Sequence, residues 1–596
     1  MATRTADYLI QRLREWGVER IFGYPGDGIN TVYGALGRAN REGLGPEFVL
    51  ARHEEMSAFE ATGYAKFGHR PGVVLATSGP GAIHTLNGLY DAKMDHVPIV
   101  AIVGQQNRMS LGANYQQEVD LTTLFKDVSA YVQLVTVPEQ LPTVVDRAMR
   151  IAQADRSVST IIFPNDVGEE EWEPPPHAHG AVPGGLGYTE PEVVPPEAEV
   201  ERAAEVLNAG SKVAMLVGQG ARGAREEVEE LAEILGAGVA KALLGKDVLS
   251  DDLPFVTGSI GLLGTKPSWD LMMEADTLLM VGSSLPYSEF LPKPGSARGI
   301  QIDLDARLIG IRYPMEVNLV GHAKPTLRRL IPLVKPKDDR SWRHSVEQGI
   351  HEWRELIAER AMQDAKPLNP QRVFSELSPR LPEDAMITSD SGSAANWYAR
   401  YLDFRGEMRG SLSGNLATMG CGVPYAIGAK FAYPDRPAFA LVGDGAFQMN
   451  GMNEMITVAQ YWRRWEDSRL VVLVLHNNDL NQVTWEQRAF EGDPKFEASQ
   501  NIIDFPYARF AEMIGLRGIK VDRPDAVAAA WDEALSADHP VVVEAVTDPD
   551  VPPLPAHVST DQAVKLLQAV LRGDTDVRGI LTQGFKGKIR EFLPRR

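Results

Sequence analysis

Residues 441–447 read Leu-Val-Gly-Asp-Gly-Ala-Phe, and this stretch decides the predicted fold. Residues 472–479 repeat its pattern and read Val-Leu-Val-Leu-His-Asn-Asn-Asp. In both stretches a run of apolar residues gives way to small residues and to residues that carry oxygen. Parallel α/β sheets present polar sites in this way, at the carboxyl ends of buried strands. The two stretches therefore predict two buried strands that end at a polar site.

Two glycines and two polar side chains in these stretches indicate the chemistry of the site. Gly443 and Gly445 allow the backbone to approach a phosphate group, and Gly445 leads into a predicted helix whose N–H groups favour an anion. Asp444 and Asn478 offer the hard oxygen ligands that Mg²⁺ takes when it also binds a diphosphate. A Gly-Asp-Gly triplet alone is more often a simple turn. The pair of stretches, each after its own apolar run, predicts a site for a diphosphate and Mg²⁺.

The totals for the chain describe a large, acidic, globular protein. Its 596 residues are too many for one core, so two to four domains are expected. Hydrophobic residues make up 44% of the chain and charged residues 23%, which is the usual balance for a soluble protein. The net charge of −20 leaves no excess of basic residues for nucleic acid, so we expect no nucleic-acid partner.

Cysteine usage and apolar patterning indicate the compartment. Cys421 is the single cysteine, so no internal disulfide can form and a reducing compartment is permitted. The N-terminal residues lack the apolar segment of a secretion signal, and no apolar run approaches the ~20 residues of a membrane span. The sequence therefore predicts a soluble, cytoplasmic protein.

Predicted strands alternate with predicted helices through most of the chain, which indicates parallel sheets covered by helices. The alternation stops between Gly168 and Glu199, where Pro, Gly and Glu residues indicate a semi-rigid linker. The predicted fold class is α/β, with three doubly wound parallel-sheet domains. The predicted segments are a first domain at 1–170, the linker at 171–198, a central domain at 199–345, a third domain at 365–555 and a tail at 556–596.

Short motifs in the first domain, together with the two stretches in the third, resemble one family. The motifs are Arg-His-Glu at 52–54, Ser-Gly-Pro-Gly at 78–81 and Asn-Gly-Leu-Tyr-Asp-Ala at 87–92. With Gly-Asp-Gly and Asn-Asn they resemble thiamine-diphosphate enzymes, most densely the quinone-reducing pyruvate oxidases and next the acetolactate synthases. The resemblance extends from about Ala6 to Pro555. It implies a pyrimidine-binding domain, a central FAD-type domain and a diphosphate-binding domain.

Glu54 has two possible interpretations. From its position alone it would be a solvated carboxylate at a helix start, where the helix dipole favours a negative charge. The resemblance implies a catalytic role, because the family's glutamate here hydrogen-bonds the coenzyme's aminopyrimidine ring and favours the imino tautomer that takes the C2 proton. The other catalytic residues that the resemblance implies are His84, which could instead be a buried core histidine, Gln117 and Met419.

The resemblance also implies which residues bind the coenzyme and the metal. Met419 would be wedged between the coenzyme rings, and the carbonyl of Ala417 would hold the amino group, although the family has glycine there. Mg²⁺ would be held by the side chains of Asp444 and Asn478 and by the carbonyl of Leu480. The implied coenzyme-binding residues are Gly79, Asn87, Ser391, Gly392, Ser393, Ala417, Met419, Gly443, Asp444, Gly445, Ala446 and Asn478.

A glycine-rich turn follows a predicted strand of the central domain, which by itself is weak evidence for a nucleotide. The resemblance to flavin-binding members of the family continues through this domain. It implies an FAD site, and the alternative is an empty or vestigial site. The implied FAD-binding residues are Gly218, Gly220, Gly245, Lys246, Gly264 and Asp303.

The reaction that the resemblance implies is decarboxylation of a 2-oxo acid to an enamine, followed by oxidation with a quinone or another acceptor. Pyruvate is only the default substrate, because Gln116 and Val483 replace aromatic residues expected in or near the pocket. The first alternative is carboligation of the acetolactate synthase type or non-oxidative decarboxylation. The second is a non-catalytic nucleotide-binding scaffold, which has no reason to keep all four of these residues: Glu54, Met419, Asp444 and Asn478.

Two expectations concern assembly. The family joins half-sites from two subunits, so we expect a homodimer or a homotetramer. The tail from Arg578 places apolar residues at roughly helical spacing among basic ones, and such an end can lie on a membrane, as in quinone-reducing relatives. Packing on a neighbouring subunit is favoured over membrane contact, because Gly584 and Gly587 weaken any helix.

Overall fold

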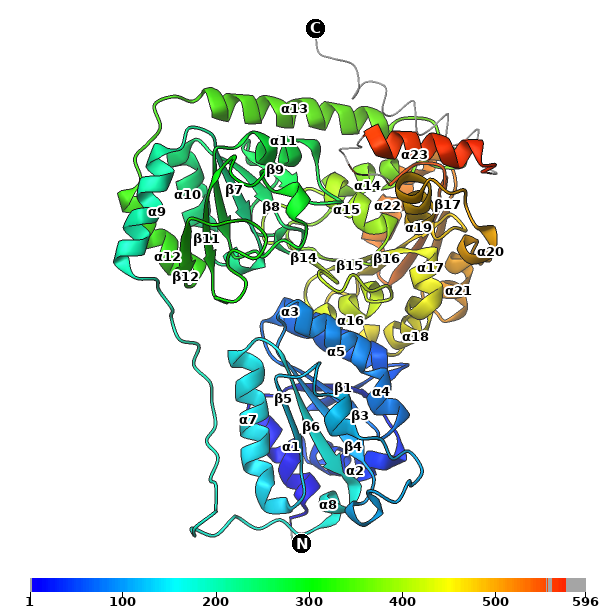
Figure 1. Ribbon diagram of the computed structural model, residues 1–596. Coiled ribbons are helices and arrows are strands. Elements are labelled where there is room, and N and C mark those ends of the chain that lie inside the picture. The colour runs from blue at the N-terminus through cyan, green and yellow to red at the C-terminus, as the bar shows by residue number, and fades with distance from the viewer. Residues whose placement is uncertain (1–2, 554, 556–559, 575–596) are drawn as a thin grey trace.

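The computed structural model describes residues 3–553, 555 and 560–574 and contains three six-stranded sheets (Figure 1). Every pair of neighbouring strands in these sheets is parallel. Most of the strands are buried along their length because they are continuous apolar runs, as parallel sheets covered on both faces require. The predicted fold class, with three doubly wound parallel-sheet domains, is confirmed.

The N-terminal sheet has the strand order β2-β1-β3-β4-β6-β5. Its strands are β1 (Arg20–Tyr24), β2 (Glu47–Leu50), β3 (Gly72–Ala76), β4 (Ile99–Gln105), β5 (Tyr131–Leu134) and β6 (Val158–Pro164). Its helices are α1 (Thr5–Glu15), α2 (Asn30–Arg41), α3 (Glu54–Gly68), α4 (Pro80–His84), α5 (Leu86–Met94), α6 (Leu121–Leu124), α7 (Leu141–Ala154) and α8 (Asn165–Glu169).

The central sheet has the order β12-β11-β10-β7-β8-β9. Its strands are β7 (Val213–Val217), β8 (Gly238–Lys241), β9 (Val256–Ser259), β10 (Thr277–Val281), β11 (Arg298–Asp303) and β12 (Val317–Val320). Its helices are α9 (Glu197–Ala209), α10 (Arg225–Leu235), α11 (Lys266–Glu274) and α12 (Ala323–Leu330). Between α8 and α9 the chain forms an extended connection without helix or strand, and α13 (Ser341–Ala361) leads on to the third domain (Figure 1).

The C-terminal sheet has the order β14-β13-β15-β16-β18-β17. Its strands are β13 (Met386–Ser389), β14 (Arg409–Leu412), β15 (Ala438–Gly443), β16 (Leu470–His476), β17 (Arg517–Val521) and β18 (Val541–Val546). Its helices are α14 (Pro370–Leu377), α15 (Ser393–Tyr401), α16 (Gly422–Ala432), α17 (Asp444–Ala446), α18 (Met452–Tyr461), α19 (Asn481–Glu486), α20 (Glu497–Gln500), α21 (Tyr507–Met513) and α22 (Val527–Ser536), followed by α23 (Thr560–Leu571).

Strand order places the polar strand ends of the C-terminal sheet together. The chain moves from β13 outward to β14 and then back to β15 on the other side of β13, so the loops after β13 and β15 diverge. Open α/β sheets bind ligands in the crevice at such a switch point. Ser389 pairs with Leu441, and Gly443 pairs with Leu475, so the carboxyl ends of β13, β15 and β16 lie side by side; this end of the strands is called the sheet edge.

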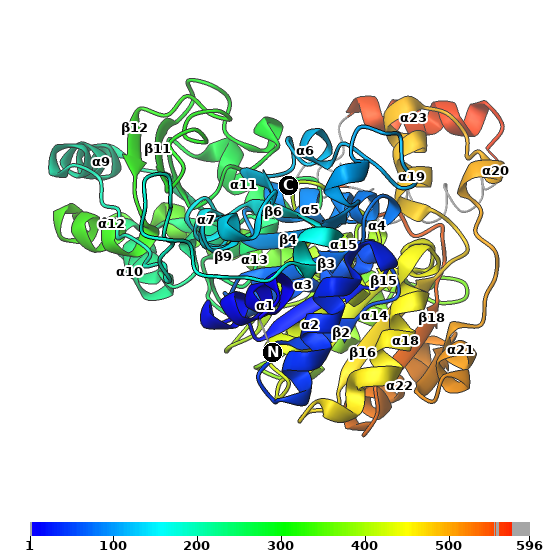
Figure 2. The same cartoon turned by 90° about the horizontal axis from the view of Figure 1, so that it is seen from below.

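The N-terminal and C-terminal domains share a tightly packed interface of α3 on α16, and Figure 2 shows the N-terminal domain in front of the junction between the other two. A Cβ atom on Gly63 would lie 2.6 Å from the Cα atom of Tyr425, and one on Gly428 would lie 2.2 Å from the carbonyl oxygen of Glu60. The two helices therefore meet backbone to backbone, which only glycine at these positions permits.

Two features bear on membrane contact. Among the described helices, none is long and apolar enough to cross a membrane. Part of the predicted tail is described: α23 packs on the π-helical turn Gln487–Glu491 through Trp485, Ala489 and Leu566. The basic, apolar segment from Arg578 lies outside the described residues.

Candidate active site

Asp444 joins the two stretches from which the fold was predicted. Its Oδ2 accepts the backbone N–H groups of Asn477 at 2.8 Å and Asn478 at 2.6 Å, and its Oδ1 accepts that of Gly445 at 2.9 Å. The side chain is buried, and burial raises the pKa of the Asp444 carboxyl to about 6, although the three N–H donors act to lower it. A nearby cation would favour the ionised form of such a carboxyl group.

Asn478 and Leu480 lie directly beside this carboxylate. Asn478 has a φ of 57°, a left-handed conformation that is rare outside glycine and is found at functional sites. Its Oδ1 lies 2.9 Å from Nε2 of His476. A Cβ atom on Gly445 would lie 2.6 Å from a methyl group of Leu480, so the Leu480 side chain packs against the Gly-Asp-Gly turn. Side-chain and carbonyl oxygens of this kind fit Mg²⁺.

Open space and helix starts at this edge fit a diphosphate. A Cβ atom on Gly392 or on Gly443 would meet no heavy atom within 4 Å. Gly392 precedes α15, which starts at Ser393, and Gly443 precedes a helical segment that continues from Asp444 through the buried Ala446 to α18. The free N–H groups at such helix starts favour anions. The residues present therefore fit a magnesium diphosphate group.

Met419 and Ala417 lie on the loop that faces this edge. The methyl group of Met419 lies 3.7 Å from the position that a Cβ atom on Gly445 would take, which places the side chain over the Gly-Asp-Gly turn. Ala417 has a φ of 51°. Left-handed backbone costs an L-residue roughly 1–2 kcal/mol, so the surroundings must hold Ala417 in place.

Asp390 is a site residue that the sequence prediction missed. It follows β13, is buried, and its carboxylate accepts the backbone N–H groups of Ser391 at 2.9 Å, Gly420 at 2.9 Å and Gly422 at 3.0 Å. Burial raises its pKa to about 6. The available signal was a carboxylate directly after a buried strand, as for Asp444. Asp390 fixes the segment just after Met419 to the sheet edge.

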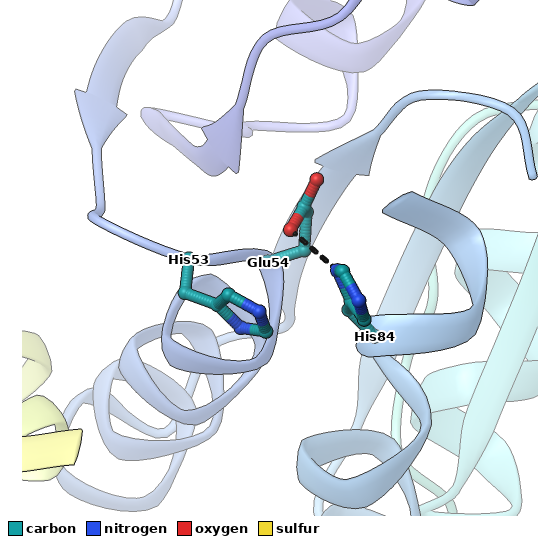
Figure 3. A group of neighbouring side chains, drawn as sticks. All are labelled: His53, Glu54 and His84. Atoms are coloured by element: carbon teal, nitrogen blue, oxygen red, sulfur yellow. Dashed lines mark hydrogen bonds and ion pairs between the residues drawn. The ribbon is translucent and has the colours of Figure 1, made fainter. Parts of the chain in front are cut away.

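Glu54 forms a second group in the N-terminal domain (Figure 3). It begins α3, and His53 caps that helix by accepting the N–H of Glu55 at 3.2 Å. Glu54 is buried, and its Oε2 lies 3.0 Å from Nδ1 of His84. The His84 side chain is 43% exposed and its ring centroid lies 4.4 Å from that of His53, so His84 is not a core histidine.

Gln117, Gly79 and Asn87 are the other residues of the N-terminal domain that were predicted to belong to the site. Gln117 has a φ of 60°, and its Oε1 accepts a hydrogen bond from Ser78 at 3.0 Å. A Cβ atom on Gly79 would lie 2.8 Å from the Cβ of Gln117, so this contact requires glycine. Asn87 donates to Oγ1 of Thr418 at 3.0 Å, which links the N-terminal domain to the loop that carries Met419.

The glycines predicted to bind FAD pack against one another. A Cβ atom on Gly218 would lie 2.4 Å from the carbonyl oxygen of Gly282, and one on Gly245 would lie 2.7 Å from the Cα of Gly218. The N–H of Gly220 donates to Gly282 at 3.0 Å. Asp303, half-buried, ends the neighbouring strand β11. Close packing of the backbone is a sufficient reason for these glycines.

Lys246 and Gly264 lie where the central domain meets α15 of the C-terminal domain. The ammonium group of Lys246 donates to the carbonyl of Ala399 at 3.2 Å and lies 3.6 Å from Asp251. The carbonyl of Gly264 accepts a hydrogen bond from Arg400 at 3.2 Å. Both residues therefore hold two domains together.

Glu544 supports the carboxyl end of β16 through its contact with His476. Burial alone raises the pKa of this carboxyl, but hydrogen bonds from His476, the N–H of Ala508 and Lys520 lower the pKa to about 2. An unfolded glutamate titrates near 4.3, so the folded state favours the ionised form. The resulting stability is complete above about pH 4.3 and is lost as the pH falls towards 2.

Glu544→Gln is therefore expected to destabilise the protein by about 2 kcal/mol at pH 7, and the difference should narrow below about pH 4.3. Thermal unfolding of both proteins at pH 7 and at pH 3.5 measures the change. Glu533→Gln is the control, since Glu533 is 45% exposed in its ion pair with Arg517 and should shift stability by less than about 1 kcal/mol. A difference between Glu544→Gln and wild type that is equal at both pH values would contradict the assignment.

Fold and site together define a class, an α/β protein whose residues at the switch point of its C-terminal sheet fit a diphosphate and a divalent cation. Models of the N-terminal TPP-binding, central and C-terminal TPP-binding domains of thiamine pyrophosphate enzymes match residues 3–124, 200–330 and 390–545. The chain belongs to the family of thiamine pyrophosphate enzymes and is a thiamine-diphosphate-dependent enzyme. The predicted family is confirmed, and a non-catalytic scaffold is excluded.

Three relatives illustrate the range of similarity. A putative thiamine pyrophosphate-containing protein, YdaP, of Bacillus subtilis is 35% identical and covers 94% of this chain and 95% of its own length. The acetolactate synthase of Arthrospira platensis is 32% identical, with 93% and 96% covered. The pyruvate oxidase of Lactiplantibacillus plantarum is 29% identical, with 92% and 89% covered.

Proposed function

We propose that the enzyme uses thiamine diphosphate and Mg²⁺ to decarboxylate a small 2-oxo acid, pyruvate by default, and passes the electrons of the product through FAD to a quinone or another acceptor. The observation that carries the proposal is the Asp444 carboxylate, buried and bonded to both polar strand ends beside open space at Gly392 and Gly443. The similarity to a pyruvate oxidase along 92% of the chain supports the reaction type.

Each group of residues has a role in this proposal. Asp444 and Asn478 hold Mg²⁺ with the carbonyl of Leu480, and the helix starts after Gly392 and Gly443 hold the diphosphate. The coenzyme, when bound, supplies an electron sink for the loss of CO₂. Glu54 exchanges a proton with the pyrimidine ring. Met419 and Ala417 support the two rings of the coenzyme. His84 and Gln117 border the substrate.

The site is proposed to be completed by a second copy of the chain. Among the described residues, the Glu54 group and the Asp444 group share no direct hydrogen bond or ion pair. Exposed apolar side chains lie near both groups, including Ile83 at 43% exposure near Glu54 and Val483 at 48% near Asn478. A homodimer or homotetramer would cover them.

Carboligation of the acetolactate synthase type, or non-oxidative decarboxylation, is the second candidate. Two observations favour it: an acetolactate synthase is 32% identical over nearly the whole chain, and the central-domain glycines have packing partners that need no flavin. Gln116 is exposed on the loop before Gln117, and its amide stands where the resemblance to pyruvate oxidases leads us to expect an apolar pocket residue.

An absorbance spectrum of the purified protein, followed by CO₂ release from a panel of 2-oxo acids, separates these candidates. We expect release that requires Mg²⁺ and thiamine diphosphate, with flavin bands in the spectrum and a faster rate when a quinone-like dye is added. A colourless protein that forms acetolactate from pyruvate would favour the second candidate. Absence of coenzyme-dependent CO₂ release from every acid would contradict both.

A further inference from the structure

The loop of residues 413–418 connects β14 to the segment before α16. It contains Ala417 and is followed directly by Met419. Ala417 adopts a left-handed conformation that an alanine avoids in a free loop. Beyond Met419, the segment is bonded to its own sheet through Asp390, which accepts the N–H groups of Gly420 and Gly422. The contacts that hold the loop before Met419 come from a different domain.

Asp91 on α5 of the N-terminal domain holds the beginning and the end of this loop. Its Oδ1 accepts the hydroxyl of Ser413 at 2.7 Å, and the same hydroxyl oxygen accepts the N–H of Thr418 at 3.0 Å. Its Oδ2 accepts a short hydrogen bond from the hydroxyl of Tyr425 on α16. One carboxylate therefore closes the loop through a single serine.

Asp95, one turn further along, holds the middle of the loop. Its Oδ2 accepts the N–H of Gly414 at 2.8 Å, and its Oδ1 accepts that of Asn415 at 2.9 Å. Lys66 on α3 neutralises Asp95 at 2.7 Å and also donates to the carbonyl of Leu412 at 2.7 Å. Both charges of this pair are buried, so the pair contributes through its geometry and its hydrogen bonds.

The residues that contact the loop lie along α5 and at its C-terminal cap, Asp95. Asn87, Asp91 and Asp95 are spaced by four residues, and residues at this spacing share a face of a helix. Asn87 donates to Thr418, as described above, and the carbonyl of Met94 accepts a hydrogen bond from the side chain of Asn415 at 2.8 Å. The segment from Asn87 to Asp95 therefore binds the loop near both of its ends, at Ser413, Gly414 and Asn415 and at Thr418.

Asp91 is the central member of this contact. It is fully buried, and burial raises its pKa to about 6, because placing a charged carboxyl in the interior costs free energy. A purely apolar interface would pack α5 against the loop without this cost. The hydrogen bonds of Asp91 instead specify one conformation of the loop.

We propose that Asp91 is a positioning residue for catalysis: through Ser413 it fixes the 413–418 loop so that the carbonyl of Ala417 and the side chain of Met419 meet the bound coenzyme. The inference rests on the proposed function for the coenzyme contact, while the holding of the loop stands on the contacts above. It assigns to the N-terminal domain a role in shaping the diphosphate-side half of the site in the same chain.

Asp91→Ala and Ser413→Ala test the proposal with two measurements. Hydrogen–deuterium exchange of the coenzyme-free protein should become faster in the peptide that covers residues 413–418. Calorimetric titration with thiamine diphosphate at saturating Mg²⁺ should give a dissociation constant raised by about 10-fold or more, the usual effect of removing a residue that orients a ligand contact. Asp91→Asn, which keeps one acceptor and the size of the side chain, should restore most of the affinity.

Asp146→Ala is the matched control, because Asp146 is equally buried in the N-terminal domain but is bonded to Arg12 and Trp16, away from the loop. It should lower the melting temperature and leave exchange at 413–418 and coenzyme affinity within twofold of wild type. If Asp91→Ala and Ser413→Ala behave like this control, the positioning role is overturned. If the wild type itself does not bind the coenzyme, the proposed function fails, and the exchange measurement still decides whether Asp91 holds the loop.

Discussion

Glu54→Gln is expected to lower turnover by about 10³-fold while the affinity for thiamine diphosphate stays within about threefold, because general acid–base groups contribute 10²–10⁴ in rate. The amide keeps the size of the side chain and can still make one hydrogen bond to the pyrimidine ring. It cannot accept a ring proton as a carboxylate does. The loss should therefore fall on turnover and on exchange of the C2 proton, and binding should change little.

Quenched-flow exchange of the C2 proton, followed by NMR, measures this effect without knowledge of the substrate. Glu55→Gln is the matched control, since Glu55 is the next residue of α3 and accepts a hydrogen bond from Asn87 rather than facing His84. The control should keep at least about a third of the wild-type exchange rate. An exchange rate in Glu54→Gln equal to that of the control would remove Glu54 from the mechanism.

Much of the C-terminal sheet and its site could be predicted because the physical constraint is local. A strand covered on both faces is mostly apolar, so a long apolar run marks β15 and β16. Polar residues directly after such runs can lie only at the sheet edge. Asp444 and Asn478 were predictable for this reason, and their direct contact follows from the parallel pairing of the two strands.

Backbone conformation at the site could not be predicted from the residues. Gln117, Ala417 and Asn478 all have positive φ, between 51° and 60°. Glutamine and alanine disfavour this region, so their local preference points away from the observed structure. Tertiary contacts such as Gly79 against Gln117 impose the conformation, and no local pattern records them.

Long-range partners were equally hidden. Asp91 and Ser413 are 322 residues apart in the sequence, and no local sequence pattern around either residue indicates that they are in contact. The central-domain glycines show a different ambiguity. Gly218 and Gly220 have the pattern of a nucleotide-binding turn, and each also fits closely against the backbone of Gly282. A glycine pattern reports a close approach, and the sequence does not say whether a ligand or the protein itself approaches.

Asp444→Asn is expected to weaken Mg²⁺-dependent binding of thiamine diphosphate by about 100-fold, the largest effect on binding of any single replacement in this site. Both carboxylate oxygens of Asp444 accept backbone N–H groups, so the amide must turn its NH₂ group towards at least one N–H donor. A buried donor left without an acceptor costs about 1–3 kcal/mol, and the loss of the negative charge removes the strongest attraction for the cation. At about 1.4 kcal/mol per tenfold change, the two effects together reach this magnitude.

Titration with Mg²⁺ at a fixed concentration of thiamine diphosphate, monitored by calorimetry, measures the change in affinity. Asp467→Asn is the control, because Asp467 likewise accepts a backbone N–H group, that of Arg469, but lies at the opposite end of β16. Its Mg²⁺ titration should overlay that of the wild type. Since both replacements remove one carboxylate from the C-terminal domain, a loss confined to Asp444→Asn would come from the site and not from the net charge of the domain. Equal affinities in the two variants would mean that the metal is held elsewhere, and the role of the Gly-Asp-Gly turn would have to be abandoned.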